Sequence, residues 1–274
     1  MAAEPAPHRP APDWPFWWSL GLISGLYAAL ITGMILADCG YARPAVVARV
    51  FASPEIRYAT ALSLLSCTVT TVLALWVAVP TGYLLARGRF PGKGILDAIL
   101  DIPLVLPPLV IGLSLLILFQ CKVPFTGRSL DQLLPVTYSV AGVVLAQFVV
   151  ASAFAVRTMR VAFEHLSARP EQVALTLGCN RAQAFWLVAL PAARRGVVTA
   201  ATLAFARSLG EFGPVLVFAG ATRLKTEVLP TTVFLELSVG NLEAAVVVAL
   251  LMVVLALLVL VLMRRFGQRE EGVP

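Results

Sequence analysis

Charged residues and histidines are scarce in this sequence of 274 residues, and each shortage argues against a class of protein. Charged residues make up 13% of the chain, whereas a soluble domain has about a quarter. The two histidines, His8 and His165, are far apart, and the four cysteines form no Cys-x-x-Cys pair. Neither a metal site nor a redox motif is indicated. A P-loop, Gly-x-x-x-x-Gly-Lys-Ser/Thr, is also missing, so this nucleotide-binding motif is not indicated.

The sequence contains several long apolar stretches that carry almost no charged residues. Hydrophobic residues make up 59% of the chain, and the mean hydropathy is +0.88. A helix needs about 20 apolar residues to cross a hydrocarbon core roughly 30 Å thick, because no water there can satisfy an open backbone. The sequence therefore predicts an all-α integral membrane protein with six transmembrane helices, at 16–37, 58–85, 99–119, 136–156, 196–219 and 242–263.

The two ends of the chain differ from this membrane domain, which we place at residues 16–265. Residues 1–15 contain five prolines and are expected to form a disordered cytoplasmic leader. Residues 266–274 are expected to form a cytoplasmic tail. Between the last two spans, the polar stretch at 222–241 predicts an outer loop with a short or re-entrant helix.

The distribution of positive charge predicts how the chain is oriented. With these six spans, 13 lysines and arginines lie on the side of both termini, 7 lie on the opposite side, and Arg207 lies inside a span. By the positive-inside rule, both termini face the cytoplasm of a multi-pass protein in the plasma (inner) membrane. This asymmetry also accounts for the net charge of +6, so nucleic-acid binding is not needed to explain it.

Two spans contain residues that are unusual inside a membrane. Pro107 and Pro108 interrupt the hydrogen-bond ladder of the third span and predict a kinked helix near a pathway. Arg207 and Glu211 stand four residues apart in the fifth span, where ionisable side chains face a bundle interior or a pathway. The pair has two interpretations that the sequence leaves open: a structural ion pair, or a contact for a passing anion.

A polar segment at 171–191 lies between apolar spans, inside a basic cytoplasmic stretch at 159–195. Pro170 is suited to begin a helix, and Gly178 permits a sharp turn between two short helices. The segment is amphipathic and carries little charge. An amphipathic helix beneath a bundle lies on the membrane or enters a groove of a partner, and the low charge favours the partner.

The segment resembles the cytoplasmic EAA loop of binding-protein-dependent ABC importer permeases. That pattern reads Glu-Ala-Ala, three residues, Gly, nine residues, Ile, one residue, Leu-Pro. Gly178 and the Leu190–Pro191 pair match it in type and spacing, whereas Gln172 stands at the position of its glutamate. The resemblance implies that a coupling segment at 159–195 docks an ATPase. Its expected coupling residues are Glu171, Gln172, Ala174, Gly178, Leu190 and Pro191.

Two further stretches, at 84–113 and 207–230, resemble the molybdate, tungstate and sulfate permeases within that family. They contain an Arg-Phe-Pro-Gly-Lys turn, a Pro-Leu-Val-Leu-Pro-Pro stretch and a Gly-Glu-Phe-Gly segment. The resemblance implies a six-helix permease that moves an oxyanion, with molybdate expected first and sulfate, tungstate or another small solute as alternatives. From the residues themselves, Pro107, Pro108, Arg207 and Glu211 are the candidate pathway residues.

The same resemblance implies the partners. They are two cytoplasmic ABC ATPase subunits that bind the ATP, an external substrate-binding protein, and a second permease copy, expected to be identical. This chain would bind no cofactor or metal and catalyse no reaction. An ATP-independent channel, and an enzyme embedded in the membrane, are alternatives from other classes. The enzyme lacks support because neither histidine lies within a span.

The charge asymmetry gives a first testable prediction, made in a chain whose four native cysteines are replaced. A cysteine introduced by Arg128→Cys is expected to react with a membrane-impermeant maleimide added to intact cells, and one introduced by Gln268→Cys is expected to be protected. Permeabilised cells serve as the control, because both positions should then react. The reverse pattern in intact cells would overturn the orientation.

Overall fold

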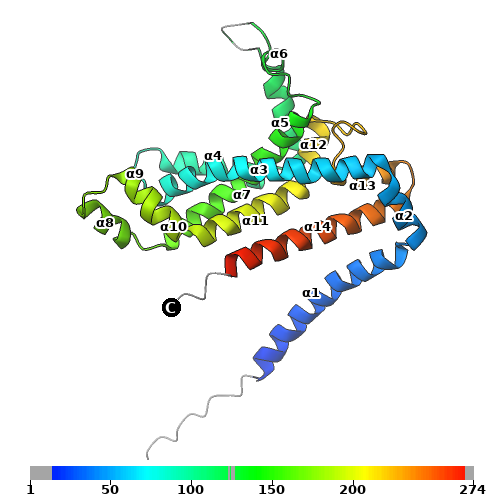
Figure 1. Ribbon diagram of the computed structural model, residues 1–274, viewed down its shortest axis with the longest axis horizontal. Helices are drawn as coiled ribbons and strands as arrows, with labels where there is room; N and C mark the ends of the chain where they lie inside the picture. Colours follow the sequence, from blue (N-terminus) through cyan, green and yellow to red (C-terminus); the bar gives the residue numbers. More distant parts are fainter. Residues whose placement is uncertain (1–13, 123, 125–126, 269–274) are drawn as a thin grey trace, which may run out of the picture.

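The computed structural model describes residues 14–122, 124 and 127–268, which form helices joined by short connections (Figure 1). The expected all-α membrane architecture is confirmed. Among these residues, the one extended pairing is an isolated bridge between Lys122 and Ser129. Most of the expected leader, residues 1–13, and the end of the expected tail, residues 269–274, lie outside the described residues.

Four helices are long and apolar enough to cross a membrane unaided. They are α1 (Trp14–Tyr41), α3 (Pro54–Arg87), α7 (Val140–His165) and α14 (Leu242–Gln268). Two bent helix pairs could supply further spans. The first is α4 (Lys93–Val105) with α5 (Pro108–Gln120), bent by 115°; the second bends by 70° between Arg181–Ala192 and Arg194–Leu209.

The span expected at 99–119, with a kink at Pro107 and Pro108, is divided into two helices. Pro107 cannot donate to the ladder, and Pro108 is suited to begin a helix, so α4 ends at Val105 and α5 begins in a new direction. The span expected at 196–219 is also divided. α11 (Arg194–Leu209) stops before Gly210, and α12 (Gly213–Phe218) begins with Pro214 in its first turn.

The remaining elements are short and connect the long helices. The short outer helix expected within 222–241 is present as α13 (Leu229–Ser238). The others are α2 (Pro44–Ala52), α6 (Leu130–Leu133), α8 (Arg169–Thr176), α9 (Arg181–Ala184), the π-helix η1 (Phe185–Ala189) and α10 (Leu190–Ala192).

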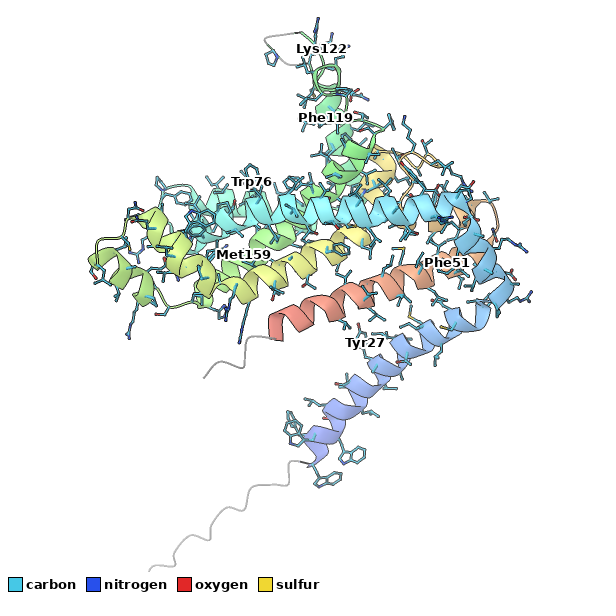
Figure 2. The ribbon with its side chains drawn as sticks, in the orientation of Figure 1. Tyr27, Phe51, Trp76, Phe119, Lys122 and Met159 are labelled. Atoms are coloured by element: carbon cyan, nitrogen blue, oxygen red, sulfur yellow. The ribbon has the colours of Figure 1, made fainter. Side chains whose placement is uncertain are left out.

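The centre of the bundle is formed by α3, α7 and α11, which pack against one another (Figure 1). Eight of the twelve buried residues in the cluster that joins them are alanines. Lipid is as apolar as leucine, so small residues that allow close backbone approach favour helix association. Met159 is fully buried at this contact, whereas Trp76 on α3 is 77% exposed on its outer surface (Figure 2).

One buried amide ties these three helices together. The side-chain nitrogen of Gln147 on α7 donates to the carbonyl oxygen of Ser208 on α11 at 3.3 Å. Its side-chain oxygen accepts from the hydroxyl of Thr70 on α3 at 3.2 Å. The polar group is thus satisfied without water, as burial at membrane depth requires.

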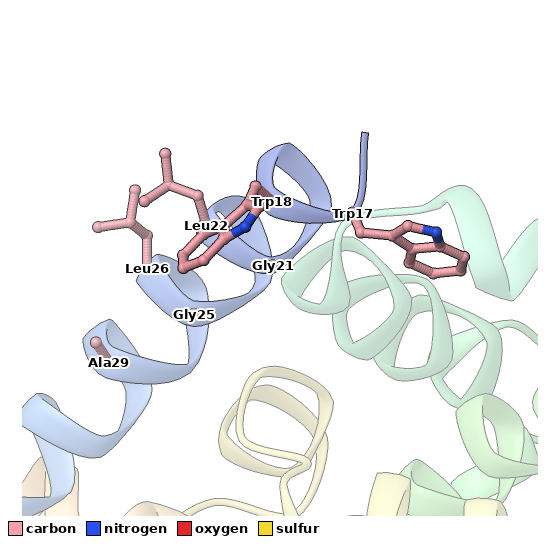
Figure 3. A pocket seen from close by; sticks show the side chains of 7 residues that line it. All are labelled: Trp17, Trp18, Gly21, Leu22, Gly25, Leu26 and Ala29. Atoms are coloured by element: carbon pink, nitrogen blue, oxygen red, sulfur yellow. The ribbon is translucent and has the colours of Figure 1, made fainter. Parts of the chain in front are cut away.

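Helix α1 extends away from this bundle and is exposed along its span (Figure 1). Trp18, Leu22 and Leu26 project from one side of it (Figure 3). A shallow groove beside them is lined by the small residues Gly21 and Gly25, with Ala29 one turn further on. This spacing of small residues is typical of helices that pack closely on another helix in a membrane.

Gly82 provides a test of the close contact between α3 and α7. A Cβ atom there would lie 2.7 Å from the Cβ of Met159 and 2.9 Å from the backbone nitrogen of Arg160. Gly82→Val is expected to destabilise the fold by about 1–3 kcal/mol or more, because backbone atoms cannot yield as a flexible side chain can. The amount of folded protein extracted from membranes should fall. Gly33→Val on α1, where no atom lies within 4 Å, is the matched control; equal yields would contradict the packing.

Candidate coupling segment and translocation pathway

The coupling segment is built as two short helices around Gly178, as expected. Gly178 has a φ of +95°, a conformation that residues with a Cβ atom rarely adopt. Its amide donates to Leu175 O at 3.2 Å, and the amide of Cys179 donates to Ala174 O at 3.0 Å. These two bonds form a Schellman motif, which satisfies the carbonyl groups left open at the end of α8.

The second helix starts with its own cap. The side-chain oxygen of Asn180 accepts from the amide of Gln183 at 2.8 Å, and the side-chain oxygen of Gln183 accepts from the amide of Asn180 at 2.9 Å. This reciprocal pair is a capping box. Further along, Pro191 lacks an amide hydrogen and cannot donate to the helix. The turn before it widens into the π-helix η1, in which the amide of Leu190 donates to the carbonyl oxygen of Phe185. Leu190 and Pro191 therefore shape the path from the segment to α11.

Apolar side chains on the segment face outward. Ala174 is buried, whereas Leu177 is 81% exposed at the turn. The other exposed apolar residues are Val173, Leu175, Trp186 and Leu187. Large apolar side chains exposed on one short segment indicate an interaction site.

Glu171 attaches the coupling segment to the end of α3. Its carboxylate accepts from the hydroxyl of Tyr83 at 2.9 Å and from Nε of Arg87 at 3.1 Å. Arg87 also donates through Nη2 to the carbonyl oxygen of Leu166, at 2.8 Å, after the end of α7. We call Tyr83, Arg87 and Glu171 the coupling joint. Gln172, beside it, is exposed.

The sequence analysis did not identify Tyr83 or Arg87 as part of this site. The available signal was an arginine in the last turn of a span and a glutamate in the first turn of a later helix. Nothing in their separation of 84 residues indicated that they meet. The pairing arises because α7 returns the chain alongside α3.

Arg207 and Glu211 do meet, but not on a continuous helix. α11 ends at Leu209, and Glu211 lies in the break that follows. Nη1 of Arg207 is 2.6 Å from Oε2 of Glu211, whose side chain is 1% exposed. Within the described structure, neither carboxylate oxygen has a partner with hydrogen-bond geometry, so charge is what holds the pair. The guanidinium also lies 5.6 Å from the centre of the Phe154 ring.

The two helix breaks lie against each other. A Cβ atom at Gly213 would be 3.0 Å from the backbone nitrogen of Leu109 and 3.1 Å from the Cβ of Pro108. A Cβ atom at Gly112 would be 2.8 Å from the Cα of Pro214. The structure thus places the Pro107–Pro108 break beside the Gly210–Gly213 break, although the sequence separates them by about a hundred residues. Broken helices at membrane depth are buried in protein or line a water-filled cavity.

Known proteins are similar to this chain in sequence or in fold. The sulfate transport system permease protein CysT of Salmonella typhimurium is 36% identical over 228 residues, which cover 81% of this chain and 82% of that protein. The molybdenum transport system permease protein ModB of Mycobacterium bovis is 36% identical over 246 residues, covering 89% and 91%. A chain in the crystal structure of a bacterial alginate ABC transporter has a TM-score of 0.72 at 14% identity, covering 95% of this chain and 96% of that chain.

Relatives in sequence that are transport system permeases make this chain the transmembrane subunit of a transporter. The family described as "Binding-protein-dependent transport system inner membrane component" matches residues 78–272. The chain belongs to this family. The matched region contains the coupling segment, the whole coupling joint and both helix breaks.

Gly178→Val is expected to uncouple the transporter while leaving it in the membrane. A β-branched residue at this φ costs about 1–2 kcal/mol or more and would open the turn, yet no neighbouring atom lies within 4 Å to disrupt the bundle. Solute uptake should be lost while the membrane-inserted amount stays near normal. Gly94→Val, at an open site with ordinary φ in α4, is the control. Normal uptake by Gly178→Val would refute the assignment of the turn.

Proposed function

We propose that this chain is the permease subunit of an ATP-driven importer that carries an oxyanion into the cell by alternating access, with molybdate as the first candidate solute. The observation that carries the proposal is the coupling segment. Its apolar side chains face outward, and Glu171 connects it directly to a membrane-spanning helix. The names of the two relatives, one for sulfate and one for molybdenum, support an oxyanion, and sulfate is the second candidate.

The same features support three kinds of partner. The outward apolar residues at Leu177 and Trp186 suit a groove in a cytoplasmic ATPase subunit, where ATP would bind. The alginate transporter structure includes a periplasmic binding protein, which supports such a partner here. A second copy of the chain would cover the small-residue groove on α1 at Gly21 and Gly25. Both termini would face the cytoplasm of the plasma membrane.

The proposed movement follows from how the segment is connected. The chain runs from α9 through η1 and α10 directly into α11, which ends at the break beside Arg207. At 1.5 Å per residue, the 16 residues of α11 span about 24 Å. Movement of the coupling segment on ATP binding would therefore shift the two opposed breaks, opening the pathway to one side and then the other.

Uptake into proteoliposomes tests the proposed activity. The chain is reconstituted with its ATPase subunits and binding protein, and accumulation of labelled molybdate is measured with sulfate, tungstate and phosphate as competitors. We expect accumulation only with ATP, and competition by tungstate or sulfate rather than phosphate. Flux that continues without ATP would contradict the importer and favour a channel. Calorimetric titration of the binding protein with the same anions separates molybdate from sulfate.

Arg207 distinguishes a pathway role from a structural one. A purely structural pair predicts that Arg207→Gln lowers the folded amount by leaving Glu211 buried and unpaired, a cost of about 3–5 kcal/mol, and that adding Glu211→Gln restores both folding and uptake. A guanidinium that attracts the passing anion predicts a double variant that folds but stays inactive, and this is the result we expect.

The matched control is Asp101→Asn with Arg157→Gln. It removes another ion pair, at 2.9 Å, that is more exposed and joins α4 to α7. Folded amount is measured by size-exclusion chromatography and uptake by labelled molybdate. We expect the control to retain uptake. Recovery of uptake in the Arg207 and Glu211 double variant would exclude the pathway role.

A further inference from the structure

A cavity of about 470 Å³ lies between the end of α3, the turn that follows it, and the coupling segment. The turn is the basic Arg-Gly-Arg-Phe-Pro-Gly-Lys stretch at 87–93, whose purpose the proposed function leaves unexplained. Volumes of this size are typical of small-molecule sites. The charged and amide side chains that line the cavity are Arg87, Arg89, Lys93, Glu171, Gln172 and Arg181.

The charges around this cavity do not balance. Arg87 and Glu171 neutralise each other across the coupling joint. Three basic side chains remain, and among the described residues no carboxylate lies within ion-pair distance of any of them. They are Arg89, Lys93 and Arg181. The Lys93 ammonium donates a long hydrogen bond, 3.4 Å, to the carbonyl oxygen of Gly88.

Gln172 leaves this excess of positive charge unbalanced. It lines the cavity at the position where the EAA pattern has a glutamate. In this chain a neutral amide therefore replaces a carboxylate that would have offset one of the three cations. An amide can still donate a hydrogen bond to an anion, whereas a carboxylate can only accept.

We infer that this cavity binds a phosphate-like anion, held between Arg89 and Lys93 from the turn and Arg181 from α9. Guanidinium groups match the oxygens of phosphate and similar tetrahedral anions, and an ammonium group supplies a compact third charge. The bound anion removes the mutual repulsion of the three cations. It also bridges the turn after α3 to α9, beside the coupling joint, and so holds the coupling segment against the bundle.

Two sources share this chemistry. α3 has 34 residues and is about 50 Å long, which exceeds a hydrocarbon core of roughly 30 Å, so its cytoplasmic end reaches the headgroup region or beyond. The phosphate of an anionic lipid in the inner leaflet can reach such a site, and so can a free oxyanion from the cytoplasm. The inference does not depend on which solute the pathway carries.

The test measures binding rather than transport, so its outcome is separate from that of the proposed function. The full chain is purified in neutral detergent, and its thermal unfolding midpoint is followed while phosphatidylglycerol, phosphatidylcholine, inorganic phosphate or molybdate is added. We expect phosphatidylglycerol or a free oxyanion to raise the midpoint and phosphatidylcholine to leave it unchanged. A shift with phosphatidylglycerol alone identifies a lipid, and a shift with phosphate or molybdate identifies a free anion.

Matched variants locate the site. Arg89→Gln with Lys93→Gln should raise the concentration for a half-maximal shift by about tenfold or more, because two charge-assisted contacts are lost. Arg89→Lys with Lys93→Arg keeps the charges and should retain most of the shift. Arg169→Gln removes an exposed cytoplasmic charge that does not line the cavity and should behave as the wild type. No shift with any anion, or an equal shift in the charge-removing double variant, would overturn the inference.

Discussion

The absence of water at membrane depth is the constraint on which this structure depends. A helix that stops inside lipid leaves amide and carbonyl groups without partners, and each costs several kcal/mol. The chain nevertheless breaks twice, at Pro107–Pro108 and at Gly210–Gly213. The two breaks lie against each other, with Gly112 and Gly213 allowing the backbones to approach; Glu211 and Gly213 are buried there, whereas Pro107 and Pro108 are exposed. The two least regular parts of the membrane domain are therefore one structural unit.

Much of the fold could be predicted because hydropathy and turn chemistry are local signals. A run of about twenty apolar residues identifies a membrane span wherever it occurs. Gly178 likewise predicts a turn, because a residue without a side chain can adopt a positive φ. The broken third span shows the limit of this reasoning. Pro107 and Pro108 predict an interruption, but a kink and a 115° reversal of direction have the same local sequence. The direction of α5 is decided by its packing on α12, which is a long-range contact.

The coupling joint illustrates the same limit for the site. Glu171 was identified from its place beside a motif, and the expectation concerned a partner subunit. In the structure its carboxylate is occupied by Tyr83 and Arg87 of the same chain. Sequence patterns of this kind indicate that a polar residue has a purpose, but the geometry of other helices determines which group it contacts. Arg207 and Glu211 differ because a spacing of four residues is itself a local signal.

The two caps of the coupling segment have a consequence for how such transporters diversify. The Schellman motif at Gly178 and the capping box at Asn180 satisfy the ends of α8 and α9 using atoms of the segment alone. The outward side chains on either side of these caps take no part in holding the backbone. If the segment docks a motor subunit as proposed, exchanging Leu177 or Trp186 would suit it to a different one while the framework beneath stays the same. Permease and ATPase could then change partners through surface substitutions.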